Sequence, residues 1–123
     1  MDVDFFRFRV QGSTTLSVGR LNFIFTYRYM KLISVKPSSK STKKYDAKFL
    51  IDGKDKVTSF GAQGYEDYTI HKDIRRRDNY RARHKNDNLN DATSPGALSW
   101  YILWGESTSF NENIRAFKRR FKL

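Results

Sequence analysis

The chain has 123 residues, carries a formal net charge of +11 and contains no cysteine. This length fits one domain with a modest core, in which most of the aromatic residues, 15% of the chain, would have to be buried. The missing cysteines exclude disulfides, thiol catalysis and cysteine-ligated zinc, and the charge favours an anionic partner: nucleic acid, an anionic membrane or an acidic protein surface.

No stretch of the sequence predicts a membrane span. The longest apolar stretch, residues 21–35, is interrupted by Arg28 and Lys31, whereas a spanning helix needs about 18 uninterrupted apolar residues. The N-terminus carries Asp2 and Asp4 in place of basic residues, which argues against a targeting peptide.

Strand-like alternation of apolar residues begins at the N-terminus. It runs through residues 3–10 and 14–29, with the period of two that is typical of strands. These two segments are therefore predicted to be strands that precede the main sheet.

Residues 30–60 are predicted to form an antiparallel sheet of three strands. The first strand ends at Pro37, which lacks the backbone donor that a central strand needs. The second, over residues 45–51, leads into Asp52-Gly53, which favours a tight hairpin because both positions tolerate positive φ. Residues 56–60 then form the third strand.

The loop between the first two strands is rich in serine and lysine. Runs of charge usually form a solvated surface, so we interpret these lysines as solvated in preference to a phosphate contact. They are Lys36, Lys40, Lys43 and Lys44.

A basic and aromatic segment follows the sheet. Gly61 and Gly64 end the sheet, residues 68–70 are predicted as a short strand, and a helix is expected from about His71 to His84. The inner face of this helix would be largely charged. Its members are Ile70, Ile74, Arg77, Arg81 and His84, flanked by Asp73 and Tyr80.

Two interpretations of this basic segment stay open. In the first, guanidinium groups contact phosphates while tyrosines stack on bases. In the second, the tyrosines complete a thin core and ion pairs form its rim, with Asp73 or Asp67 as the partner of Arg77 and Arg81.

Two capped helices are predicted near the C-terminus. Ser94 stands as an N-cap before Pro95, and Gly105 follows as the stop, so residues 95–104 form a short helix. Residues 109–112 have the pattern of a capping box, which opens a second helix that continues to about residue 122.

No motif predicts catalysis, a metal or a cofactor. His71 and His84 would point about 220° apart on one helix, so they cannot share a metal ion. Residues 61–64 lack the Lys-Ser or Lys-Thr of a phosphate-binding loop, and no serine lies in a nucleophile elbow. We therefore expect a protein that is not an enzyme, and His84 with Asn79 leaves a nuclease as the main enzymatic alternative.

The candidate residues for binding nucleic acid or an acidic partner lie in the basic segment and in the last helix. They are Tyr68, His71, Lys72, Arg75, Arg76, Arg77, Tyr80, Arg81, Arg83, His84, Lys118, Arg119 and Arg120.

A set of short segments, spread from residue 30 to the C-terminal half, points to a family. The segments are MKLISVKPS at 30–38, FGA at 60–62, DYT at 67–69, HKD at 71–73, Tyr80 with Arg83 and His84, GALS at 96–99 and ILW at 102–104. Together they resemble a family of small, basic, uncharacterised proteins encoded by nucleocytoplasmic large DNA viruses of algae and protists, such as chloroviruses and other phycodnaviruses.

The resemblance implies a viral origin and, for a small basic protein of this kind, a place in the virion, within the capsid lattice or beside the genome. The implied partners are other virion proteins and viral DNA, and the implied locations are the virion and, during assembly, the host cytoplasm or nucleus. No catalytic residue is implied. The resemblance also places the start of the domain at residue 30, so residues 1–29 would be a lineage-specific addition or the product of a misassigned upstream start.

The sequence thus predicts one α+β domain over residues 30–123, with a small antiparallel sheet packed by two or three C-terminal helices. The expected function is that of a minor capsid or capsid-associated protein that binds acidic partners through a basic face. The alternative is a DNA-binding protein that acts on the viral genome without sequence specificity. Binding to DNA is expected to be weak near physiological salt, because no base-reading motif is present.

Overall fold

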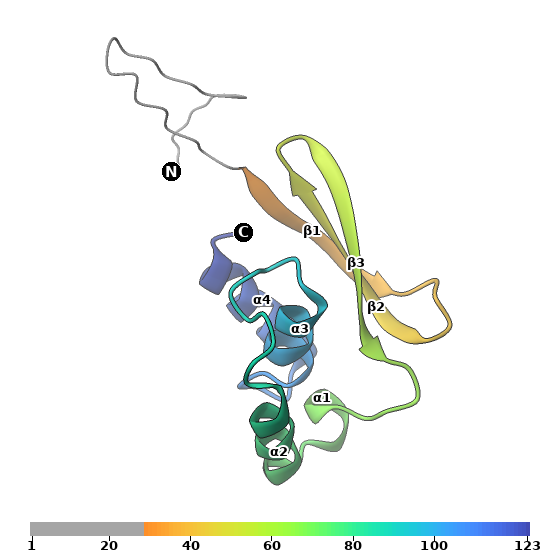
Figure 1. Cartoon of the computed structure of the whole chain (residues 1–123), viewed down its shortest axis with the longest axis vertical. Coiled ribbons are helices and arrows are strands. Elements are labelled where there is room, and N and C mark those ends of the chain that lie inside the picture. Colours follow the sequence, from red (N-terminus) through yellow and green to blue (C-terminus); the bar gives the residue numbers. More distant parts are fainter. Residues whose placement is uncertain (1–28) are drawn as a thin grey trace, which may run out of the picture.

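The computed structural model describes residues 29–123, so the strands predicted before Tyr29 lie outside the described residues. A three-stranded antiparallel sheet is followed by helices, which confirms the predicted α+β class (Figure 1). The strands are β1 (Met30–Pro37), β2 (Lys43–Ile51) and β3 (Lys54–Ala62), in the order β1-β2-β3. The helices are α1 (Tyr68–His71), α2 (Ile74–His84), α3 (Pro95–Leu98), the π-helical η2 (Ser99–Leu103) and α4 (Phe110–Phe121).

The β2–β3 hairpin turns where the sequence predicts it. Asp52 and Gly53 have φ angles of 50° and 85°, the left-handed values that a two-residue hairpin turn of this kind needs. Ile51 pairs with Lys54 directly beside the turn. This register sets every second side chain of both strands on the inner face of the sheet.

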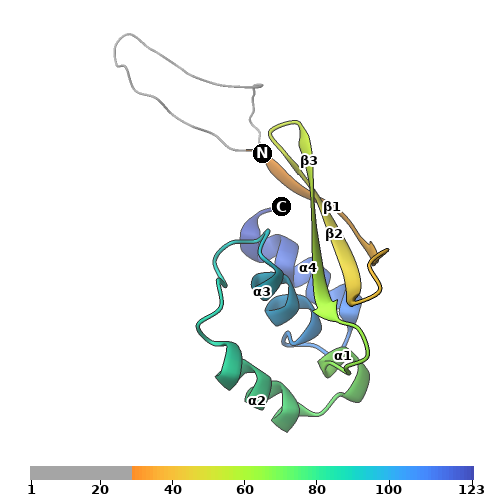
Figure 2. The same cartoon turned by 45° about the vertical axis from the view of Figure 1, so that its right-hand side comes forward.

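Among residues 29–123, the helices cover one face of the sheet and leave the other open. Helices α3 and α4 lie against the sheet in both views (Figures 1 and 2), whereas α2 stands apart beyond its end. Apolar side chains of the sheet meet those of the helices in one continuous cluster, and burying each large one contributes roughly 1.5–3 kcal/mol. The buried members are Leu32, Ala47, Phe49, Phe60, Ala92, Leu98, Ile102, Leu103 and Phe117.

The predicted helix over residues 95–104 is present, but its second half is wider than an α-helix. Ser94 caps it by accepting a hydrogen bond from the backbone N–H of Ala97 at 3.1 Å. From Ser99 the chain winds as a π-helix, and the N–H of Trp104 donates to the carbonyl of Ser99 at 3.0 Å. The wider turn ends the helix on the carbonyls of Trp104 and Gly105.

Helix α4 begins as predicted, although its capping box is only half formed. The hydroxyl of Ser109 accepts from the backbone N–H of Glu112 at 3.2 Å. The carboxylate of Glu112 accepts from Arg115 at 2.7 Å, while the N–H of Ser109 donates to the hydroxyl of Ser107 at 2.9 Å.

The predicted strand over residues 68–70 is wrong, whereas the helix expected from about His71 to His84 is present but begins only at Ile74. Asp67 accepts from the backbone N–H of Thr69 at 2.9 Å and starts α1. Lys72 then adopts a left-handed φ of 57°, which ends α1, and Asp73 caps α2 by accepting from Arg75 N–H at 3.0 Å. Two aspartate caps so close together favour two short helices over a strand or one long helix.

The turn between η2 and α4 is held by one buried amide. The side-chain nitrogen of Asn113 donates to the carbonyls of Ile102 at 2.9 Å and Ser107 at 2.7 Å, and its oxygen accepts from the N–H of Ser107 at 3.0 Å. Gly105 passes directly beside this amide, so that a Cβ there would lie 2.3 Å from the carbonyl oxygen of Tyr101. This packing fixes the direction of the carbonyls that α2 contacts.

Candidate functional site

Helix α2 is attached by two arginines and one stacked tyrosine, Tyr80, and not by a continuous apolar face. Within the described structure none of its residues is fully buried. The Nε and Nη2 atoms of Arg81 donate to the carbonyl of Trp104 at 3.1 and 2.9 Å, and Arg77 donates to the carbonyl of Gly105 at 3.4 Å. These carbonyls end the α3–η2 helical segment, where the unpaired acceptors and the helix dipole favour a cation.

The two arginines also cover aromatic rings and share one exposed carboxylate, while Arg77 contacts that of Asp78 as well. The Arg77 side chain is only 12% exposed and its guanidinium lies over Tyr68, while that of Arg81, 22% exposed, lies over Trp100. Glu106 lies 3.8 Å from Arg77 and 3.2 Å from Arg81 and is 85% exposed. Arg77 and Arg81 therefore serve the fold.

The predicted acidic partners of these arginines are wrong. Asp73 is the N-cap of α2. Asp67 is buried and forms an ion pair with Lys44 at 2.6 Å, where the two side chains are 3% and 11% exposed. Lys44 is consequently not the solvated loop lysine that the sequence predicts.

Three rings form a stack between α2 and η2. Tyr80 lies between His84, with ring centroids 4.1 Å apart, and Trp104, with centroids 4.3 Å apart and planes within 3° of parallel. Burial raises the pKa of Tyr80 to about 12, and the nearby carboxylate of Asp87 contributes to this rise. Because both faces of its ring are covered, Tyr80 presents no free face to a nucleic-acid base.

His71 also belongs to the fold. Its Nδ1 accepts from the backbone N–H of Asp73 at 2.9 Å, and its ring lies against Trp104 and Tyr68. Its Nε2 is buried and has no hydrogen-bond partner among the described residues. With Nδ1 as the acceptor, a neutral His71 carries its proton on Nε2.

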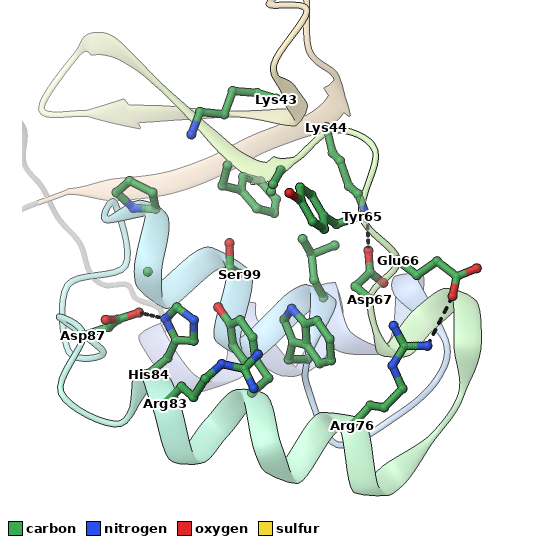
Figure 3. Close-up of a pocket in the computed structure, with 18 of the residues that line it drawn as sticks. Lys43, Lys44, Tyr65, Glu66, Asp67, Arg76, Arg83, His84, Asp87 and Ser99 are labelled. Carbon is green, nitrogen blue, oxygen red and sulfur yellow. Dashed lines mark hydrogen bonds and ion pairs between the residues drawn. The ribbon is translucent and has the colours of Figure 1, made fainter.

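A cleft of about 600 Å³ lies between α2 and the end of the sheet (Figure 3). The wall on the α2 side consists of residues at helical spacing: Arg76, Asn79, Tyr80, Arg83 and His84. Lys43 and the loop after β3 form the opposite wall, and residues of α3 and η2 form the floor. Sequence patterns do not predict this cleft, because its two walls come from segments that are far apart in the chain.

The candidate residues thus fall into three groups. Tyr68, Arg77 and Arg81 are used inside the fold, together with Tyr80 and His71. Arg76, Arg83 and His84 line the cleft. The remaining candidates are Lys72 and Arg75 at the start of α2 and Lys118, Arg119 and Arg120 on α4; these are exposed, and Arg120 lies over the ring of Tyr101.

No metal centre or membrane helix is found in the described part of the chain. Among residues 29–123, no group of three or more histidine or acidic side chains is arranged to hold a metal ion. No helix in that range is long and apolar enough to cross a membrane.

Comparison with known proteins gives one similarity. Residues 33–84 are similar to a family of unknown function, DUF5754. Neither a curated protein nor a solved structure matches the chain. The matched range runs from β1 to the end of α2, so it includes the sheet and both walls of the cleft.

Proposed function

We propose that the protein is a structural virion protein of a large DNA virus, which holds anionic partners through exposed basic side chains and catalyses no reaction. The viral setting rests on the sequence resemblance described above. The binding role rests on how the basic residues are distributed in the structure.

The observation that carries the proposal is a division of the cations into two groups. Arg77, Arg81 and Lys44 are largely buried and satisfied by carbonyls or by Asp67. A second group is exposed and has no carboxylate within ion-pair distance among the described residues, so its charge is open to an outside partner. On and beside the helices this group comprises Lys72, Arg75, Arg83, Lys85, Lys118, Arg119 and Lys122.

Weak binding is sufficient for a structural role of this kind. A surface of lysines and arginines without a base-reading element gives non-specific duplex affinities of about 10⁻⁴ to 10⁻⁶ M near physiological salt. In a virion the partner is present at high local concentration, so that this affinity keeps the surface occupied.

A salt titration of fluorescence anisotropy with mixed-sequence duplex DNA, repeated with an acidic peptide, tests the proposal. We expect both probes to bind at low salt and to be largely released at about 0.15 M salt. Arg119→Gln removes one positive charge from this surface. It is expected to reduce the slope of log affinity against log salt concentration by up to about 0.9, the value for one neutralised phosphate. Affinity that does not depend on salt would contradict a role for the basic surface.

The alternative function, DNA binding on the viral genome, is distinguished in the same experiment. Submicromolar duplex affinity at about 0.15 M salt would favour this alternative over the capsid role. Mass spectrometry of purified virions completes the test, because a structural component must be present at a fixed, high copy number. Its absence from virions would overturn the structural role.

A further inference from the structure

The cleft beside α2 is a second candidate binding site, which shares only Arg83 with the exposed basic surface. Its volume of about 600 Å³ lies within the range of roughly 300–1,000 Å³ that is typical of small-molecule sites. The floor is formed by the buried core residue Leu103 and by Ser99 and Trp104, so it is part of the packed helical layer.

The position of α2 cannot be explained by core formation alone. A helix usually docks by burying an apolar face, but α2 fully buries none of its residues within the described structure. Instead, Arg77 and Arg81 are immobilised, which costs side-chain entropy. Their contacts hold a wall that carries Asn79 and Arg83 at a fixed distance from the sheet.

The acidic side chains of the cleft all contact a basic residue, two of them in ion pairs with Lys44 and Arg76 and the third in a hydrogen bond with His84. Figure 3 shows three acid–base contacts along its walls: Lys44 with Asp67 at 2.6 Å, Arg76 with Glu66 at 3.3 Å and His84 with Asp87 at 2.9 Å. Each carboxylate that lines the cleft has a basic partner.

Two cations are left over after this pairing. Lys43 extends from the sheet and Arg83 from α2, on opposite sides of the cleft (Figure 3). Neither has a carboxylate within ion-pair distance among residues 29–123. The cleft therefore has an excess of positive charge, and lysine and arginine are the residues that proteins use to bind phosphate.

An exposed aromatic ring lies at the mouth of the cleft. Tyr65 belongs to the loop after β3, lines the cleft and is 74% exposed, so its ring has a free face. Unlike Tyr80, it stacks on no other aromatic ring within the described part of the chain. A planar base can stack on such a face. In nucleic-acid complexes this stacking contributes about 1–3 kcal/mol, which corresponds to a severalfold to about hundredfold increase in affinity.

From these observations we propose that the cleft binds a nucleoside phosphate, with Lys43 and Arg83 on the phosphate and Tyr65 against the base. The ligand is either a free nucleotide or the phosphorylated end of a nucleic-acid strand, which share this chemistry. The site overlaps the exposed basic surface proposed above only at Arg83, because the other members of that surface, Arg75 and Lys118 among them, do not line the cleft.

Calorimetric titration of the full chain with adenosine monophosphate, adenosine and inorganic phosphate tests the proposal. We expect saturable binding of the nucleotide, with adenosine and inorganic phosphate each weaker by about tenfold or more, because each lacks one of the two sets of contacts. Inorganic phosphate that binds as tightly as the nucleotide would overturn the role of the base. The absence of saturable nucleotide binding would overturn the site.

Variants locate the binding in the cleft. Lys43→Gln and Arg83→Gln remove one charge each and are expected to weaken nucleotide binding by about tenfold or more. Asn79→Trp places a large ring on the wall and is expected to block the cleft. Arg75→Gln and Lys118→Gln remove a charge outside the cleft and serve as matched controls, so equal weakening by these controls would overturn the assignment.

A competition experiment identifies the source of the ligand. A short single-stranded DNA with a terminal phosphate is added to the protein–nucleotide complex, alongside the same strand without the phosphate. Displacement by the phosphorylated strand alone supports a strand end as the ligand, and no displacement by either strand supports a free nucleotide. Equal displacement by both strands, without dependence on Arg83, would overturn the proposal.

Discussion

Replacing Arg81 by alanine tests whether α2 is held by its arginines. The substitution removes two hydrogen bonds to the carbonyl of Trp104, at 3.1 and 2.9 Å, and the contact of the guanidinium with Trp100. One hydrogen bond from a charged donor contributes about 1.5–3 kcal/mol, and the two bonds to the single Trp104 carbonyl are counted together as one; the arginine–aromatic contact adds about 0.5–1 kcal/mol. The ion pair with the exposed Glu106 adds less than about 1 kcal/mol. We therefore expect the free energy of unfolding to fall by about 2–4 kcal/mol.

Urea denaturation of the variant and of two companions measures this loss. Arg81→Lys keeps the charge but not the paired donors, so an intermediate loss of about 1–2 kcal/mol is expected. Arg75→Ala, on the same helix but with an exposed side chain, should change stability by less than about 0.5 kcal/mol. A loss below about 0.5 kcal/mol for Arg81→Ala would contradict this prediction. It would show that neither the carbonyl of Trp104 nor the position of α2 depends on the Arg81 side chain.

Three further predictions concern the buried amide, the stacked tyrosine and the N-terminal boundary. Asn113→Ala is expected to lower the free energy of unfolding by about 3 kcal/mol, because the carbonyls of Ile102 and Ser107 are left without its donor; a loss below about 1 kcal/mol in urea denaturation would contradict this. Tyr80 should ionise with a pKa of about 12, above the ordinary value of 10.0 that applies to the unfolded chain. The stability that its buried neutral form contributes is therefore complete below pH 10.0 and is lost as the pH rises towards 12. Ultraviolet titration with Tyr80→Phe as the control measures this, and ionisation of Tyr80 together with exposed tyrosines would count against it. A fragment of residues 30–123 is expected to unfold cooperatively on heating, whereas a molten fragment would show that residues 1–29 are needed for folding.

Local signals in the sequence predict most of the fold. The alternation of apolar residues and the Asp52-Gly53 turn predict the three strands, and Ser94 and Ser109 predict the starts of two helices. Each of these signals involves residues within a few positions of one another. The break between α1 and α2 is not predicted, because it depends on Lys72 adopting a left-handed conformation, which is uncommon for a lysine.

The site depends on contacts that have no local signal. The sequence indicates an ionic framework around Arg77 and Arg81 but not its acceptors, which are backbone carbonyls 28 and 23 residues further along the chain. Arg77→Ala would leave no carboxylate buried without a partner, because the two carboxylates beside Arg77, Asp78 and Glu106, are exposed. The place of Lys43 in the cleft is not predicted for the same reason, since only the fold brings it opposite Arg83.

The way α2 is attached determines how it responds to temperature. The heat capacity change of a transition follows the apolar surface that it exposes, and α2 fully buries none of its own residues within the described structure. The free energy of detaching α2 alone should therefore vary less with temperature and with urea than the free energy of unfolding the core, although detachment also exposes the stacked rings of Tyr80 and Trp104. Added salt weakens the attraction between Glu106 and the arginines but leaves the buried core largely unaffected. Salt is therefore expected to weaken the attachment of α2 more than it weakens the core.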